Sequence, residues 1–168
     1  MAKKSKIAFP KKNAPPKPEE FAARLPLAAG KRFEAIRAFL RKQKGVSEEL
    51  FYYGPKSGWA FRYLRGPQSI CAVMVYADRP LGIVALDASA LRSVDWKTLT
   101  EAGKKARRMA HGSPALLWLD LPLDGTGAAD FKALLKTKLK TLPPPPAAPT
   151  AAGRASGSAA ALPPDRDV

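Results

Sequence analysis

The first clear pattern along the chain is helical. From Lys31 to Gln43, apolar residues recur every three or four positions, and Arg32, Arg37, Arg41 and Lys42 lie elsewhere around the helix. This spacing predicts an amphipathic helix over 31–43, and Gly45 supplies a stop signal just beyond it. The apolar stripe consists of Phe33, Ile36, Phe39 and Leu40.

After Gly45 the apolar spacing changes to two, which is typical of strands. The connections between these segments are short and contain Gly or Pro: GPKSG, RGPQ and ADRP. A parallel return needs a crossover of about a dozen residues, so strands joined this closely are predicted to run antiparallel. The four predicted strands are Leu50–Tyr53, Gly58–Leu64, Ser69–Tyr76 and Leu81–Leu86.

The helical spacing returns beyond Asp87. Asp95 is a good N-cap for a helix over 96–110, which His111-Gly112 would end. Its predicted inner stripe is Trp96, Leu99, Ala102, Ala106 and Met109. An apolar strand over 115–121 and a lysine-rich helix over 128–140 follow. The pattern as a whole predicts an α+β fold, with an antiparallel sheet of about five strands packed against three helices.

The two ends of the chain have a different composition from its middle. Residues 1–18 contain six lysines, four prolines and no acid, and residues 141–168 are rich in proline and alanine. Neither segment has enough apolar residues to offset the entropy lost on ordering. We therefore expect a disordered basic arm over 1–18, one α+β domain over 19–140 and a disordered tail over 141–168.

The net charge of +15 adds an expectation about partners. About +6 of it lies in the arm and +9 in the domain, whereas the tail is neutral. Such a surface favours polyanions, so weak, sequence-independent nucleic-acid binding is one hypothesis. The candidate cations lie in the arm and in the run KKARR: Lys3, Lys4, Lys6, Lys11, Lys12, Lys104, Lys105, Arg107 and Arg108.

Several classes of chemistry find little support in the sequence. Cys71 is the only cysteine and His111 the only histidine, which excludes an intramolecular disulfide and a multi-histidine metal site. Neither a nucleophile elbow nor a phosphate-binding loop is present, so we predict no catalytic residue, metal or cofactor, and an enzyme is the third hypothesis. With no secretory leader and no long apolar run, the expected location is cytoplasmic.

The stretch 51–65, FYYGPKSGWAFRYLR, combines six aromatic residues with three cations. Strand alternation places Trp59 and Arg62 on opposite faces of the sheet. The rings are either core residues or the lining of a cleft on the face that the helices leave uncovered. Under the second interpretation the chain is a binding or accessory domain for a small ligand or a protein. The candidate ligand-binding residues are Tyr53, Lys56, Trp59, Arg62 and Tyr76.

A family resemblance begins at the same stretch. The motif is YG-x-K-x-GW-x-x-R, formed by Tyr53, Gly54, Lys56, Gly58, Trp59 and Arg62. With the order of the surrounding elements, it resembles a bacterial family of unknown function related to the small YdhG-like, loosely frataxin-like domains. The resemblance covers about 19–140 and implies helices packed on an antiparallel sheet, with no established chemistry. Some relatives are described as iron chaperones, a role that needs clustered carboxylates, whereas the helices here are lysine-rich.

Overall fold

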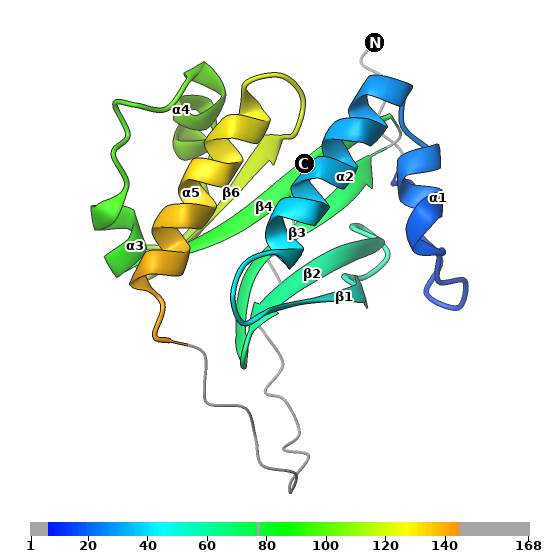
Figure 1. Ribbon diagram of the computed structural model, residues 1–168, viewed down its shortest axis with the longest axis horizontal. Helices are drawn as coiled ribbons and strands as arrows, with labels where there is room; N and C mark the ends of the chain where they lie inside the picture. The colour runs from blue at the N-terminus through cyan, green and yellow to red at the C-terminus, as the bar shows by residue number, and fades with distance from the viewer. Residues whose placement is uncertain (1–6, 77, 145–168) are drawn as a thin grey trace, which may run out of the picture.

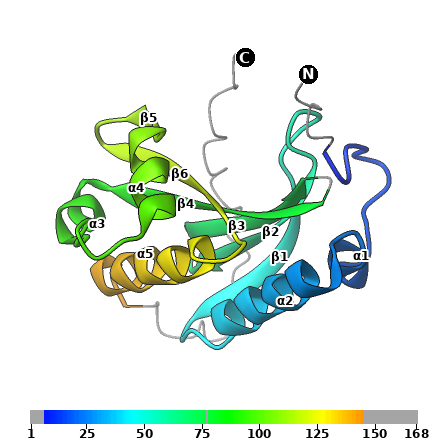
Figure 2. The same ribbon diagram turned by 90° about the horizontal axis from the view of Figure 1, so that it is seen from above.

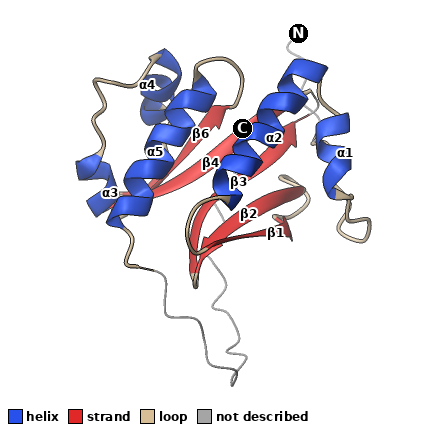
Figure 3. Cartoon of the chain, viewed as in Figure 1, coloured by secondary structure: helices blue, strands red, loops and turns tan. Residues whose placement is uncertain are grey.

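A computed structural model describes residues 7–76 and 78–144 of the chain, which form an antiparallel sheet with helices packed against it (Figures 1 and 3). The strand order in the sheet is β1-β2-β3-β4-β6-β5. The strands are β1 (Val46–Tyr52), β2 (Trp59–Arg65), β3 (Gln68–Tyr76), β4 (Arg79–Asp87), β5 (His111–Ser113) and β6 (Leu116–Pro122). The helices are α1 (Pro18–Ala23), α2 (Leu27–Arg41), α3 (Ala88–Ser93), α4 (Glu101–Arg108) and α5 (Gly127–Thr141).

The main helices cover one face of the sheet. Figure 2 shows α1, α2 and α5 on the same side, where α2 packs on β1 and β4 and α5 packs on β3, β4 and β6. This confirms the predicted α+β class with its antiparallel sheet and packed helices. Within the described residues the sheet has six strands and not five, and five helices are present and not three.

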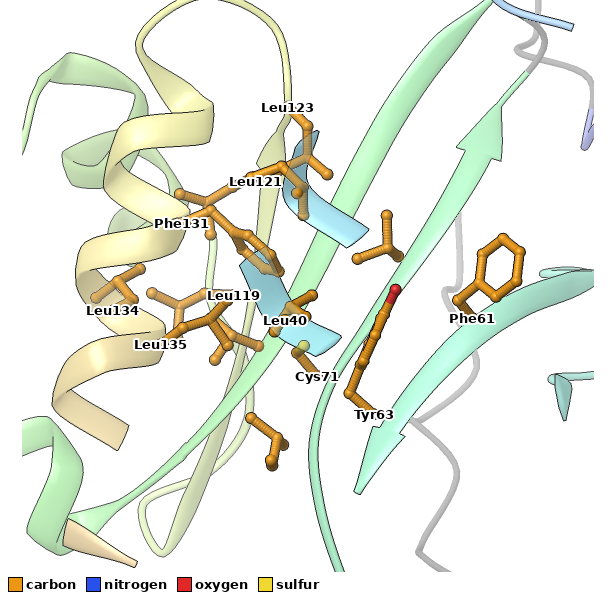
Figure 4. Close-up of a cluster of buried hydrophobic side chains, with 14 of the residues drawn as sticks. Leu40, Phe61, Tyr63, Cys71, Leu119, Leu121, Leu123, Phe131, Leu134 and Leu135 are labelled. Carbon is orange, nitrogen blue, oxygen red and sulfur yellow. The ribbon is translucent and has the colours of Figure 1, made fainter. Parts of the chain in front are cut away.

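The core lies between this sheet face and the helices. Figure 4 shows side chains from α5, β6 and β2 gathered there, with Leu40 of α2 among them. Gly82 makes the closest approach of α5 possible, because a Cβ at this position would lie 2.6 Å from the ring of Phe131. The largest fully buried side chains include Tyr63, Phe21, Phe33, Phe131, Ile36 and Leu40.

The described part of the expected basic arm packs against the sheet. Ile7 forms a bridge with Tyr76, and the Trp59 amide donates to the carbonyl of Phe9. Gly58 has φ +72°, and a Cβ there would lie 2.5 Å from the Phe9 carbonyl oxygen. Residues 7–9 therefore fill the gap where β2 and β3 separate. We expected a disordered arm over 1–18 that buries almost no apolar area. Within its described part, the apolar run Ile7-Ala8-Phe9 packs against the sheet, and Ala8 is 6% exposed.

The predicted helix over 96–110 is wrong in its boundaries. The structure has α3 before it, then an irregular segment, and α4 begins only at Glu101. Asp95 does not cap a helix: its carboxylate accepts from the Lys97 amide within a turn. The N-caps are Asp87 for α3 and Thr100 for α4. Met109, expected on the inner stripe, is 69% exposed.

The chain continues differently after α4 as well. His111 and Gly112 do not end a helix but begin β5, which pairs with β6 as a hairpin. Helix α5 runs to Thr141, so the predicted tail starts inside its last turn. Residues 1–6 of the expected arm and residues 145–168 of the expected tail lie outside the described residues.

Candidate functional site

The start of α4 is fixed by a carboxylate from α5. Asp130 is 3% exposed, and it accepts hydrogen bonds from the Thr100 amide at 3.1 Å, the Thr100 hydroxyl at 2.5 Å and the Gly103 amide at 2.8 Å. These bonds satisfy amide groups that a helix N-terminus leaves without intrahelical partners. Because Asp130 is buried in the core-facing side of α5, α4 is held in place and its cations project from a rigid support.

A basic hollow lies over α4 and the irregular segment that precedes it. Its volume is about 590 Å³ and it opens to solvent. Four of the five lining residues are cations and the fifth is an indole: Trp96, Lys97, Lys104, Arg107 and Arg108. We call this set the α4 groove. Lys104, Arg107 and Arg108 are sequence-predicted candidates, whereas Trp96 was expected in a helix stripe and Lys97 was not singled out.

The cations of the α4 groove are largely unpaired. Lys104 is 3.3 Å from the Glu101 carboxylate, one turn away. Within the part of the chain that the structure describes, no ion pair involves Lys97, Arg107 or Arg108. The Arg107 guanidinium lies 4.5 Å from the centre of the Trp96 ring, which orients both groups. The groove therefore presents positive charge beside an aromatic plane.

The hairpin of β1 and β2, which contains the stretch 51–65, also combines aromatic rings with an arginine, but this arginine is paired with an acid. The Arg62 guanidinium lies 3.6 Å from the centre of the Phe51 ring and pairs with Glu49, the residue directly opposite on β1. Burial raises the pKa of Tyr53, so its hydroxyl stays protonated. Arg62 thus has an acidic partner on the neighbouring strand.

The other candidate ligand-binding residues are spread around the sheet. Trp59 lies on the helix-covered face, and its indole donates to the Lys11 carbonyl at 2.9 Å. Lys56 is exposed in the β1–β2 loop, and Tyr76 is at the end of β3 on the opposite face. None of the five lines the α4 groove or a second hollow of about 210 Å³ at the β2–β3 turn. Tyr53 and Tyr76 pack on one apolar cluster of the sheet, whereas Trp59 packs against the core on the other face.

The remaining nucleic-acid candidates contribute little to the groove. Lys11 and Lys12 are exposed in a turn of the arm, and Lys105 is exposed on α4 but does not line the groove. Lys3, Lys4 and Lys6 lie outside the described residues.

Two buried ionisable clusters serve the core. Arg37, 4% exposed, contacts Glu48 at 2.7 Å and stacks 3.8 Å from the centre of the Phe61 ring. Burial raises the pKa of Glu48, but hydrogen bonds from Arg37 and Tyr63 and the nearby arginine charges outweigh it and leave the pKa lowered. The second cluster is Lys138, whose ammonium donates to the carbonyls of Ser69 and Ile70 at 3.0 and 2.8 Å.

The Lys138 ammonium and the Cys71 thiol of the second cluster are both buried, at 4% and 2% exposed. Burial lowers the pKa of Lys138 to about 8, although the nearby Cys71 and Asp87 raise it. Burial also raises the pKa of the Cys71 thiol, which favours its unreactive form. Among residues 7–76 and 78–144, no group of three or more His, Cys, Asp or Glu side chains is placed to hold a metal ion. None of the helices described there has the length and apolar character that a membrane crossing needs.

No family model, curated protein or solved structure matches this chain. The resemblance to the YdhG-like domains therefore stays a prediction, and the class that the fold defines is that of an α+β domain with an antiparallel sheet.

Proposed function

We propose that this protein binds single-stranded nucleic acid without sequence preference, through the α4 groove. The observation that carries the proposal is four cations and an indole lining one solvent-open hollow on a rigid helix. Single-strand binders combine a positive channel for the phosphates with aromatic planes for the bases. Trp96 and the guanidinium stacked on it offer such a plane, and Lys97 and Arg108 flank it.

The hairpin gives weaker support for the other sequence-based hypothesis, a domain for a small ligand. Its arginine is already paired with Glu49 and stacked on Phe51, and Trp59 is engaged by the arm. A ligand would have to displace these contacts. Among the described residues, Lys104 is the one groove cation in an ion pair, which it forms with Glu101.

A salt titration tests the proposal. The probe is a 15-residue oligothymidylate, and the groove variant carries Lys97→Ala, Arg107→Ala and Arg108→Ala. A matched control removes three exposed cations from other helices: Lys31→Ala, Arg32→Ala and Lys136→Ala. Each phosphate neutralised on a single strand contributes about −0.7 to the slope of log affinity against log salt. The groove variant should flatten this slope by up to about 2 and the control by less than about 0.5.

If the salt slope flattens equally in the two variants, the overall positive charge of the protein, and not the groove, attracts the strand. If the unaltered protein shows no binding at about 50 mM salt, the proposed function is wrong.

A further inference from the structure

The face of the sheet opposite the main helices carries its own apolar cluster. Ala60, Met74 and Ile83 are buried there, between 0% and 5% exposed. The partly buried residues packed around them are mostly aromatic: Tyr53, Tyr76, Leu81 and Trp118. We call these seven residues the open-face cluster. All of them belong to strands or to the residue that follows β1, so no described helix contributes to the cluster.

The open-face cluster has the chemistry of a surface for a proline-rich segment. Two tyrosines and a tryptophan surround a floor that includes the small residue Ala60, and Ala72 and Ala85 beside it are also buried. Proline-rich segments form a preordered extended helix and dock on grooves lined by aromatic side chains. Because that helix is already ordered, little conformational entropy is lost on docking.

The chain itself ends in such a segment. The 24 residues from 145 to 168 include five prolines and eight alanines, and their charges cancel. They follow directly on Pro143 and Pro144, which line the second hollow together with Arg65, Pro67 and Gln68 at the β2–β3 turn. The segment therefore starts beside one end of the sheet.

The length of the segment is sufficient to cross the open face. The five intervals between six strands, at about 4.8 Å each, span roughly 24 Å. A proline-rich extended helix rises about 3.1 Å per residue, so about ten residues cover that width. We propose that residues 145–164 bind the open-face cluster of their own chain. This inference is independent of the α4 groove and of the proposed function.

The test places a spin label on the segment and reads its distance to each face. Ser158→Cys introduces the labelling site, and Cys71 does not compete because it is 2% exposed. In the full ¹⁵N-labelled chain, the label should remove more than half of the signal from the Trp118 indole and the amides of Met74 and Ile83. The amides of α2, on the far side of the sheet, should keep theirs.

Two further experiments test whether the segment on the open face comes from the same chain and whether its prolines contribute to binding. In a mixture of spin-labelled ¹⁴N chain and unlabelled ¹⁵N chain, the open-face signals should be unaffected. Attenuation there would identify a second copy as the occupant and overturn the proposal. Replacing Pro145, Pro146 and Pro149 with glycine should reduce the attenuation at least twofold. Equal attenuation of both faces, or of the β2–β3 turn alone, would also overturn it.

Discussion

The hairpin and the α4 groove contain the same kinds of residue, aromatic rings beside arginines, yet the two regions differ in what the charges contact. In the hairpin, Arg62 has Glu49 opposite it and Phe51 beneath it. In the groove, Arg107 stacks on Trp96 and no described acid pairs with it. An arginine that already has an acidic partner stabilises a fold, whereas one without a partner is available to a ligand. Aromatic-plus-basic composition alone does not distinguish the two.

The largest expected effect tests the structural half of this comparison. Arg37→Ala should reduce the free energy of unfolding by about 3–5 kcal/mol, because it leaves the buried Glu48 carboxylate without its main partner. Urea unfolding measures the loss. The control is Arg41→Ala, since Arg41 also approaches Glu48 but is 47% exposed. A loss below about 1 kcal/mol in the control is expected. Equal losses would contradict the importance of the buried pair.

Lys138 gives a pH-dependent test of a buried cation. Its pKa is about 8 in the fold, and about 10.4 is usual for an exposed lysine. Between these values the unfolded chain binds the proton and the folded chain does not, so stability should rise with pH from about 8 to 10. The rise from this group is up to about 3 kcal/mol. Lys138→Met should abolish it in unfolding curves taken across this range, and a variant with the same pH profile would contradict the account.

Arg62→Gln should have a smaller effect, about 1–2 kcal/mol, because the side chain is only partly buried. Glu49→Gln removes the same ion pair from the other side. If the Arg62–Glu49 ion pair causes the loss of stability, the double variant should lose less free energy of unfolding than the sum of the two single losses. Oligothymidylate affinity should be unchanged in all three. A stable Arg62→Gln protein with weakened binding would return the hairpin to consideration as the site.

The smallest effect on stability is expected in the groove. Arg107→Ala with Arg108→Ala should change the free energy of unfolding by less than about 0.5 kcal/mol, because both side chains are exposed. The same variant should still flatten the salt slope of binding. A loss of several kcal/mol would show that these arginines support the fold.

The sequence predicted the α+β class and the four consecutive strands β1 to β4 because alternation and turn residues are local signals. The sequence-based prediction misplaced the start of α4 because the residue that fixes it is distant in the sequence. Asp130 lies 30 residues beyond Thr100 and accepts hydrogen bonds from the Thr100 amide and hydroxyl. Thr100 is itself a good N-cap, so the true helix start was present as a competing signal to Asp95.

The candidate site was also predicted only where its signals are local in the sequence. The run KKARR marked three groove cations, since clustered charge is visible in any sequence. Trp96 and Lys97 join them only because the segment before α4 is not helical, which depends on the same Asp130 contacts. Likewise, the pairing of Arg62 with Glu49 depends on the β1–β2 register, which places them directly opposite.

The most direct test uses the three tryptophans, since each lies in a different region. Trp96 lines the α4 groove, Trp59 contacts the arm beside the hairpin, and Trp118 belongs to the open-face cluster. Their indole N–H signals, assigned by Trp→Phe replacement, can be followed together while oligothymidylate is added. We predict that the Trp96 signal shifts first and most, while the other two stay nearly constant. A shift at Trp59 or Trp118 with Trp96 unchanged would contradict it.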